Sequence, residues 1–301
     1  MQEVRSEYHP WSCIPVRSGV DSAVNLLSRR TFLLGSGTAL ASYLAYELNT
    51  LRVISYTVPV RNLPTPFHGF TILHLSDLHQ KRFGKNQARL LSLIKRYRYD
   101  MVALTGDLIN RSRPQGDAAL ELVSGLGAKP LFFVNGNNEW DAAYLHGYRV
   151  TGLLSAAGVT ILDNRAIPLT RGGEHVWIAG VDDPISGKER LTRALSGTKD
   201  SAPVILLAHS PILFPRAARA GVGLLLAGHT HGGQIRIPLV GALWAPDMGF
   251  LPPWDYGEFQ RGETTLIVNG GLGESIFPIR FNMPPEIVLV TLIPLKGTAA
   301  V

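Results

Sequence analysis

The sequence predicts an α/β protein in which strands and helices alternate and pack as layers. Short apolar runs recur along the chain, and each ends in a cluster of polar and turn residues. Apolar runs of about four to eight residues, ended in this way, are typical of buried strands. Helical patterns separate the early runs, at residues 88–94 and 118–126. This alternation of strand and helix indicates a layered α/β fold.

The predicted elements begin after residue 50. Residues 53–60 alternate in polarity and contain Pro59, which suits an edge strand. Buried strands are expected at residues 70–75, 101–104, 131–134, 203–208 and 222–227. All five end in polar residues, and α/β folds place their sites at the carboxyl ends of strands. We expect one domain over residues 51–297, preceded by a separate segment over residues 1–50.

Residues 1–50 are predicted to be a targeting or membrane segment. Arg29 and Arg30 precede a mildly apolar stretch that reaches about Tyr46, as in a twin-arginine export signal. An uncleaved membrane anchor is the alternative, although the stretch is short for a spanning helix of about 20 apolar residues. The arginines precede the apolar stretch, so the positive-inside rule keeps the N-terminus cytoplasmic. We therefore expect an exported or membrane-anchored protein whose main domain is extracytoplasmic.

The composition restricts the class of partner. The chain has 301 residues, 46% of them hydrophobic and 17% charged, which is enough to form a real core. The formal net charge of +6 suits an anionic partner such as a phosphate group or an acidic membrane surface. The cations are scattered and form no continuous stripe with aromatic residues, so nucleic-acid binding is not expected. The single cysteine, Cys13, excludes an internal disulfide.

The polar clusters supply a set of candidate metal ligands. The set is Asp77, His79, Asp107, Asn137, His209, His229 and His231. Asp77 and His79 are two positions apart, so on an extended segment their side chains would project to the same side. One such residue after a strand is commonly a cap or turn residue, but five clusters together favour a metal site. Oxygen and nitrogen donors without thiolate suit Mn²⁺, Zn²⁺ or Fe. Seven donors suit two ions about 3.5–4 Å apart with a bridging carboxylate.

The ordered motifs resemble those of the calcineurin-like metallophosphoesterases. The family pattern is D-x-H, G-D, G-N-H-[DE], an isolated H and G-H-x-H. Here it reads S-D-L-H, T-G-D-L, G-N-N-E, L-L-A-H-S-P and A-G-H-T-H-G-G-Q. The resemblance covers roughly residues 65–295. Within the family, the chain most resembles the bacterial branch that carries a membrane or twin-arginine segment before the catalytic domain. It implies a four-layer sandwich of two mixed β-sheets flanked by helices.

The resemblance also implies a metal-dependent phosphoesterase with two divalent ions, Mn²⁺ being preferred and Zn²⁺ or Fe the alternatives. The first ion would take Asp77, His79, His231 and Asp107. The second would take Asp107, Asn137, His209 and His229. Asp107 would be the catalytic carboxylate that bridges the ions and positions the attacking hydroxide.

Asn138 stands where this family usually has a histidine that acts near the leaving group. An amide cannot deliver a proton at any useful pH. Leaving groups that depart unaided are therefore favoured, such as those of a pyrophosphate or an aryl diester, over alkyl monoesters. We expect Asn138 to contact substrate. The alternative is that it only shapes the turn after the strand.

These observations predict a phosphodiesterase or pyrophosphatase acting on a membrane- or envelope-associated substrate. A UDP-linked lipid A precursor is one example, because the related UDP-diacylglucosamine hydrolases cleave such a pyrophosphate. That step is cytoplasmic, so the cytoplasmic face of the inner membrane is the alternative location. A phosphomonoesterase and a metal-retaining binding protein with weak catalysis are the alternative functions. His74 lies inside an apolar run and is expected in the core, with support of a metal ligand as its alternative role.

Overall fold

The structure, a computed structural model, describes residues 29–198, 200–275 and 278–295. The chain divides into two compact units, Met1–Ala41 and Ser42–Val301. Helix α1 (Arg29–Asn49) begins in the first unit and ends in the second. Among the described residues, no helix combines the length and apolar character needed to cross a membrane. The residues before Arg29, including Cys13, lie outside the described part of the chain.

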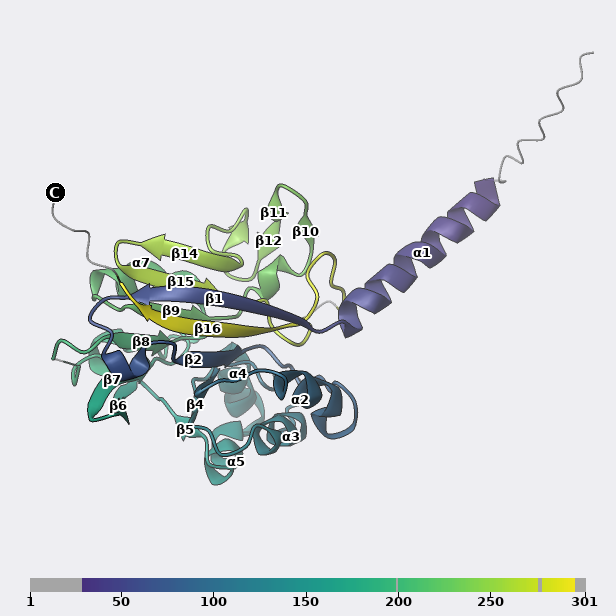
Figure 1. Cartoon of the computed structure of the whole chain (residues 1–301). Helices are drawn as coiled ribbons and strands as arrows, with labels where there is room; N and C mark the ends of the chain where they lie inside the picture. Colours follow the sequence, from purple (N-terminus) through teal and green to yellow (C-terminus); the bar gives the residue numbers. More distant parts are fainter. Residues whose placement is uncertain (1–28, 199, 276–277, 296–301) are drawn as a thin grey trace, which may run out of the picture. The chain divides into compact units, whose positions relative to one another are not determined.

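Two six-stranded sheets form the centre of the second unit (Figure 1). The first has the order β1-β16-β2-β3-β4-β5, with strands at Arg52–Val60, Glu286–Pro294, Thr71–Leu75, Met101–Leu104, Leu131–Phe133 and Thr160–Ile161. The second has the order β14-β15-β9-β8-β7-β6, with strands at Gly257–Arg261, Thr264–Val268, Leu224–Ala227, Val204–Leu207, Glu174–Gly180 and Arg165–Arg171. Both sheets are mixed. Strands β2 to β5 run parallel but β16 is antiparallel to β2, and β15, β9, β8 and β7 run parallel but β14 and β6 are antiparallel to their neighbours.

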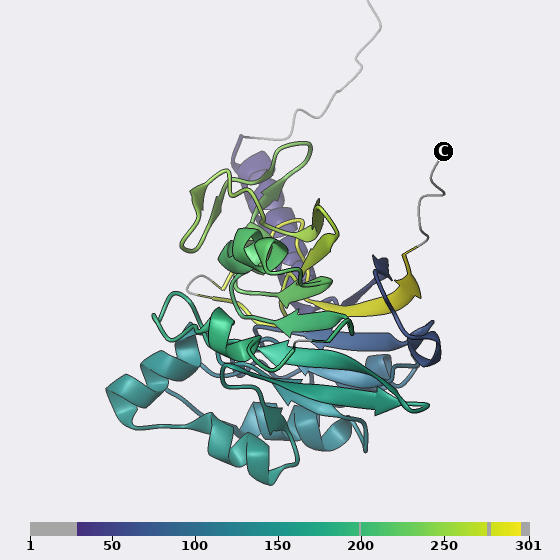
Figure 2. The same cartoon turned by 90° about the vertical axis from the view of Figure 1, so that its left-hand side faces the viewer.

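Helices cover the outer face of each sheet. The first sheet is covered by α2 (Ala88–Ile94), α3 (Asp117–Gly125), α4 (Asn137–His146) and α5 (Val150–Ala156). The second is covered by α6 (Leu191–Ala194) and α7 (Phe214–Arg219). Figure 2 shows the blue-to-teal helices together on one side of the strands. Short 3-10 helices lie at Thr65–Phe67, Lys85–Gln87, Pro211–Leu213 and His231–Gly233.

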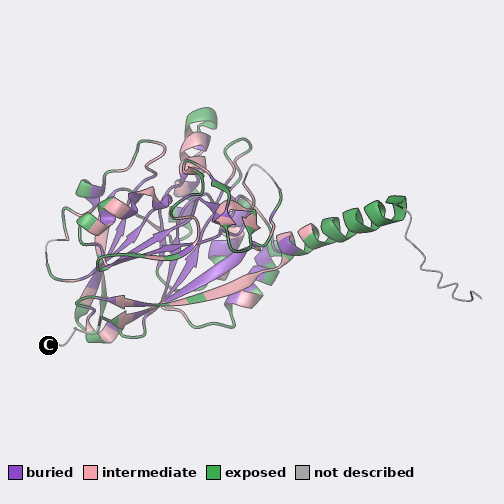
Figure 3. Cartoon of the chain, turned by 90° about the horizontal axis from the view of Figure 1, so that it is seen from above, coloured by how far each residue is buried: buried purple, intermediate pink, exposed green. Residues whose placement is uncertain are grey.

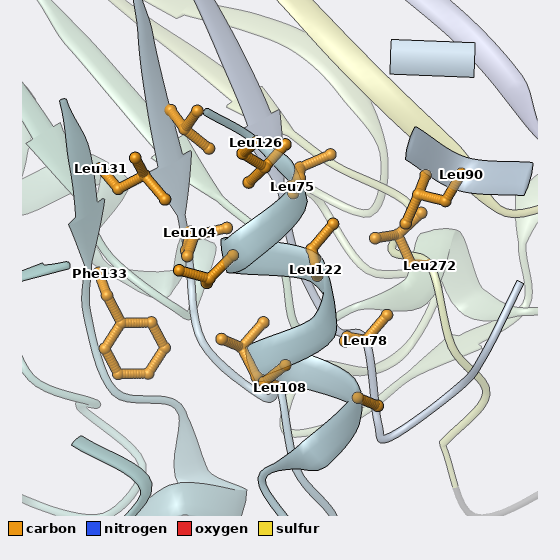
Figure 4. Close-up of a cluster of buried hydrophobic side chains, with 14 of the residues drawn as sticks. Leu75, Leu78, Leu90, Leu104, Leu108, Leu122, Leu126, Leu131, Phe133 and Leu272 are labelled. Atoms are coloured by element: carbon orange, nitrogen blue, oxygen red, sulfur yellow. The ribbon is translucent and has the colours of Figure 1, made fainter. Parts of the chain in front are cut away.

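Strands β3, β4, β8 and β9 are apolar along their whole length because both of their faces are buried. In β2, Ile72 points into the core between the sheets, whereas Leu73 and Leu75 point toward the helices. Figure 4 shows the helix-side cluster, where Leu75 and Leu104 lie near Leu122. The central strands are accordingly coloured as buried in Figure 3, whereas edge strands such as β6 and β14 are partly exposed. The predicted four-layer arrangement of two mixed sheets flanked by helices is confirmed.

The predicted elements are found close to their expected positions. Strands β2, β3, β4, β8 and β9 and helices α2 and α3 lie within two residues of the predicted ranges, and β1 is an edge strand as expected. Strand β16 was not predicted as a separate element, and it lies between β1 and β2. Two small hairpins were also not predicted. They are β10–β11 (Arg236–Ile237 and Gly241–Ala242) and β12–β13 (Trp244–Ala245 and Gly249–Phe250).

Candidate dimetal site

The five predicted polar clusters follow β2, β3, β4, β8 and β9 at the carboxyl ends of these strands. Six of the predicted ligands form two groups, in each of which one ligand atom per residue lies within 4.8 Å of the others. The groups are Asp77, His79 and His231, and Asp107, His209 and His229. All six residues are buried. Each group has the donors to hold one divalent ion.

In the first group, two imidazole nitrogens and a carboxylate face one another. Nε2 of His79 lies 3.1 Å from Nε2 of His231, which lies 3.4 Å from Oδ1 of Asp77. On the other side of its ring, Nδ1 of His79 lies 3.1 Å from Oδ1 of Asn110, whose amide nitrogen donates to the carbonyl of His79. Because Oδ1 can only accept, Nδ1 of His79 carries the ring proton. Its Nε2 therefore presents a lone pair to the group.

In the second group, two nitrogen lone pairs face each other. Nδ1 of His209 lies 2.8 Å from the carbonyl oxygen of Thr105, an acceptor, so Nε2 of the neutral ring is bare. Nε2 of His229 lies 2.8 Å from Oδ2 of Asp247, so Nδ1 of that ring is bare. The two bare nitrogens are 3.0 Å apart. Lone pairs at this distance repel unless a cation lies between them, so the donor set fits a metal ion.

The electrostatics of the second group lead to the same conclusion. Burial opposes protonation of His209, but the carboxylate of Asp107 raises the pKa of this histidine well above its ordinary value. In the metal-free protein, the Asp107 carboxylate therefore favours the charged form of the His209 ring. A metal ion bound at Nε2 of His209 would therefore compete with a proton.

Asp107 lies between the two groups. Its Oδ2 is 3.4 Å from Nε2 of His209 and 3.6 Å from Nε2 of His79. Although burial raises the pKa of Asp107, the positive charge of His209 holds it well below its usual range. Oδ1 of Asn137 lies 3.2 Å from the same Nε2 of His209, which places the amide beside the second group. The structure thus brings all seven predicted ligands together.

The backbone of these loops is strained. Asp77, His79, Asp107, His229 and His231 have φ between 46° and 71°. Left-handed backbone at a residue other than glycine costs on the order of 1–3 kcal/mol and is characteristic of functional sites. The expectation that Asp77 and His79 lie on an extended segment is therefore wrong. Two left-handed residues, rather than the alternation of a strand, place these side chains.

Glu139 holds the loop that carries Asp107. Its carboxylate accepts the backbone N–H groups of Asp107, Leu108 and Gly136, each at 2.8 Å. Burial and the Asp107 charge raise the pKa of Glu139 to about 7, whereas the N–H donors favour its ionised form. A Cβ at Gly136 would lie 2.2 Å from Oδ1 of Asp107. Only glycine fits this approach of two loops.

Three supporting groups were missed in the sequence. They are the Asn110 side chain against His79, the Thr105 carbonyl against His209 and the Asp247 carboxylate against His229. Such partners select the ring nitrogen that binds a metal. Asn110 was detectable, because it follows Asp107 within the same polar cluster. Asp247 belongs to the connection between β12 and β13 and carries no motif.

Asn138 binds the central carboxylate in this structure. Its Nδ2 donates to Oδ2 of Asp107 at 2.5 Å, and its backbone N–H donates to Oδ1 at 2.9 Å. Its Oδ1 accepts the backbone N–H of Arg111 at 3.0 Å. The side chain therefore lies directly beside the site and connects Asp107 to the following loop. Its predicted contact with substrate stays a prediction.

His74 lies beneath the site as a buried neutral residue. Burial lowers the pKa of His74 to about 3. Its Nε2 lies 2.8 Å from Oγ1 of Thr105, which donates to Oγ of Ser76 at 2.8 Å. His74 is thus part of the core, as expected, and joins a polar chain between the loops that follow β2 and β3.

Fold and site together define a two-metal phosphoesterase, and the comparisons with known proteins identify the family. Residues 70–233 match the family model of calcineurin-like phosphoesterases. The uncharacterized metallophosphoesterase YkuE of Bacillus subtilis is 30% identical over 283 residues, covering 88% of this chain and 98% of the relative. The phosphodiesterase YaeI of Escherichia coli is 28% identical over 286 residues, covering 89% of this chain and 100% of the relative. The chain belongs to the calcineurin-like phosphoesterase family and is a metal-dependent phosphoesterase.

Solved structures match at lower similarity. The NAD nucleotidase of Haemophilus influenzae aligns with a TM-score of 0.43 and 18% identity, over 67% of this chain and 45% of that one.

Proposed function

We propose that the chain is a dimetal phosphodiesterase or pyrophosphatase. The observation that carries the proposal is the position of Asp107, whose single Oδ2 faces a histidine of each ligand group at 3.4 Å and 3.6 Å. A carboxylate shared by two sets of bare nitrogens is suited to bridging two cations. One ion would also be bound by Asp77, His79 and His231. The other would also be bound by Asn137, His209 and His229.

Several residues of the chain hold the candidate metal ligands in position. When bound, the two ions would supply Lewis-acid activation of water and neutralise charge on the phosphoryl oxygens. Asn110 and Asp247 hold the imidazoles of His79 and His229 in the tautomers that present a lone pair. Glu139 accepts the N–H groups of Asp107 and Leu108 and that of Gly136, and so holds the two loops together. The six residues of the two ligand groups are buried, which limits their contact with bulk water.

The side chain of Asn138 supports a proposal for the class of substrate. This side chain lies beside the central carboxylate and offers no proton to a leaving group. An alcohol with a pKa near that of water, about 16, leaves poorly without an acid. A phosphate released from a pyrophosphate ionises last at about pH 6 and departs unaided. We therefore propose a pyrophosphate or an activated diester as substrate, with a UDP-linked lipid as one candidate.

Turnover of aryl phosphoesters tests this proposal. Purified full-length protein with Mn²⁺ is expected to hydrolyse bis(p-nitrophenyl) phosphate faster than p-nitrophenyl phosphate. Asp107→Asn removes the charge shared by the two groups and is expected to abolish both activities. Preference for the monoester would favour the alternative of a phosphomonoesterase. Equal rates in Asp107→Asn and wild type under saturating metal would refute the dimetal assignment.

The metal and the location are also proposed. The mixed oxygen and nitrogen donors support Mn²⁺, with Zn²⁺ or Fe as alternatives, and metal analysis of the purified protein distinguishes these ions. Export through a twin-arginine signal, or anchoring by the same segment, is supported by Arg29 and Arg30 at the start of α1. Phe32, Leu33, Leu34 and Leu40 of this helix are exposed apolar side chains, which suits contact with a membrane. The cytoplasmic face of the inner membrane is the alternative location.

A further inference from the structure

An unusual density of exposed apolar side chains lies on the two small hairpins beside the site. These hairpins form the apolar hairpin segment, residues 235–251 (β10 to β13, Figure 1). Its large exposed side chains include Leu239, Val240, Leu243, Trp244, Phe250 and Leu251. Phe250 is 83% exposed and Leu239 is fully exposed. Soluble monomers rarely expose apolar side chains in such a group without a partner.

The segment is an ordered structure. β10 pairs with β11 and β12 with β13, and the N–H of Leu251 donates to the carbonyl of Leu243 at 3.0 Å, which joins the hairpins. The segment is also attached to the site, because Asp247 in the second hairpin lies 2.8 Å from Nε2 of His229. Its apolar side chains are therefore presented by a scaffold that touches a candidate metal ligand.

The backbone at Leu239 gives a second, independent indication. The turn Ile237–Val240 is closed by the N–H of Val240, which donates to the carbonyl of Ile237 at 3.1 Å. Pro238 is followed by Leu239 at φ 69°, a position where turns favour glycine or asparagine. Leu251 is also left-handed, with φ 49°. Leu239 is fully exposed and Leu251 is 65% exposed, so the folded domain gains little burial from them to offset this strain, which suggests that their apolar side chains serve a contact outside the chain.

The polar content of the segment indicates the kind of partner. Its two charged side chains both bond residues outside it, Arg236 to Asp255 at 2.5 Å and Asp247 to His229. The indole of Trp244 is the remaining polar side-chain group in these residues. A protein interface typically includes about one hydrogen bond per 100–200 Å². A lipid surface demands none and favours tryptophan at its boundary.

The attachment of helix α1 supports the same partner. The ring of Tyr43 packs edge-on against Phe281 at 5.4 Å between centroids. The backbone of Phe281 is bonded in turn to Gln234 and Arg236, where the apolar hairpin segment begins. Glu47 also accepts the N–H of Met283 at 3.0 Å. The C-terminal end of α1, within the second unit, thus contacts the chain beside the start of the apolar hairpin segment.

We propose that the apolar hairpin segment is a membrane-docking surface that inserts into the lipid–water interface next to the candidate dimetal site. The segment would place the site at the headgroup level, where lipid-linked phosphoesters are accessible. This contact is additional to any anchoring by the N-terminal segment. The inference concerns membrane binding and is measured without substrate, so its failure is distinct from failure of the proposed hydrolysis.

Vesicle binding of the full-length protein tests the proposal. Vesicles of phosphatidylethanolamine and phosphatidylglycerol are sedimented with wild type and with the triple variant Leu239→Ser, Phe250→Ser and Leu251→Ser, at high salt. The triple variant is expected to bind at least about tenfold more weakly, because three apolar side chains no longer enter the bilayer. Tyr144→Ser, Leu145→Ser and Leu153→Ser replace three exposed apolar side chains on α4 and α5 and form the matched control, which is expected to bind as wild type. Melting temperatures verify that all variants are folded.

Trp244 provides a local readout that binding through α1 cannot imitate. Brominated lipids in the vesicles are expected to quench wild-type fluorescence, and Trp244→Phe should lose a distinct part of this quenching. Equal vesicle affinity of the triple variant and wild type would overturn the proposal, as would equal quenching in Trp244→Phe and wild type. A triple variant that dissociates an oligomer but keeps its vesicle affinity would also overturn it, and would assign the surface to a second copy of the chain.

Discussion

At the scale of single residues, the candidate site depends on which ring nitrogen of each histidine carries the proton. Asn110, Thr105 and Asp247 each accept a hydrogen bond from one side of an imidazole, so the opposite nitrogen is bare. The ligand motifs were recognisable in the sequence because the family spaces them in a fixed order. Their partners were not all recognisable, since Asp247 approaches His229 only through the tertiary fold.

Asp247 is expected to act as a positioning residue for His229. Asp247→Ala removes the acceptor at Nε2 and frees the ring to adopt the wrong tautomer, so affinity for the second metal ion should fall about 10- to 100-fold. Asp247→Asn keeps an acceptor oxygen and should retain more of this affinity. Metal stoichiometry and dissociation constants by calorimetry measure both effects. Unchanged metal affinity in Asp247→Ala would show that the contact is incidental.

Asn138→His tests the missing acid. A positioned acid contributes about 10²–10⁴-fold, so alkyl phosphodiesters should gain most and pyrophosphates little. The variant also gives up the Nδ2 contact to Asp107 and the acceptor for Arg111, so metal must be kept saturating. The measurement is kcat/KM across esters of rising leaving-group pKa. A shallower dependence in the variant supports the missing-acid account, and two parallel lines would leave Asn138 as a turn residue.

At the scale of elements, continuous apolar runs predicted the central strands because both of their faces are buried. Leu224–Ala227 and Val204–Leu207 are buried at every position, so their sequences leave little room for another interpretation. Strand β16 is mostly apolar, but its place between β1 and β2 depends on pairing across more than 200 residues of sequence. The left-handed backbone at the candidate ligands was not predictable for a similar reason. Contacts such as those of Glu139 impose that backbone from outside the loop.

The buried His74 of strand β2 lowers the free energy of unfolding by an amount that depends on pH. Burial lowers the pKa of the folded residue to about 3, whereas the unfolded value is about 6.5. The unfolded chain therefore binds a proton below about pH 6.5 while the folded chain does not, so stability is present above this pH and falls as the pH is lowered toward 3. Between pH 7 and pH 5, this residue should remove about 2 kcal/mol from the free energy of unfolding.

The matched comparison for His74 is His74→Gln, which can keep a bond to Thr105 and does not titrate. Free energies of unfolding are measured by urea titration at both pH values with a chelator present. Other groups that titrate are common to both proteins and cancel in the difference. The variant should lose less stability on acidification than wild type, by about 2 kcal/mol. The same pH dependence in both proteins would contradict the assignment of a neutral buried ring.

At the scale of the whole molecule, the chain joins an α/β phosphoesterase domain to an N-terminal segment of different character. Asp77, Asp107 and their partners lie on loops of the two sheets, within the second unit. The apolar hairpin segment and the end of α1 both attach to Phe281 in this unit. A phosphoesterase that works at a membrane surface would combine these features.

Replacing Arg29 and Arg30 by lysine tests the proposed export. The twin-arginine pathway reads the arginine pair itself, so two lysines should block translocation although the positive charge is unchanged. A plain membrane anchor depends only on charge and apolar length and should tolerate the exchange. The location of the catalytic domain is measured by protease accessibility in spheroplasts, with Lys95→Arg as a matched conservative exchange outside the segment.

Wild type and the Lys95→Arg variant should be degraded from outside, whereas the double lysine variant should be protected. Degradation of all three would show that the arginine pair is not read, and would favour an anchor. Protection of all three would place the catalytic domain on the cytoplasmic face.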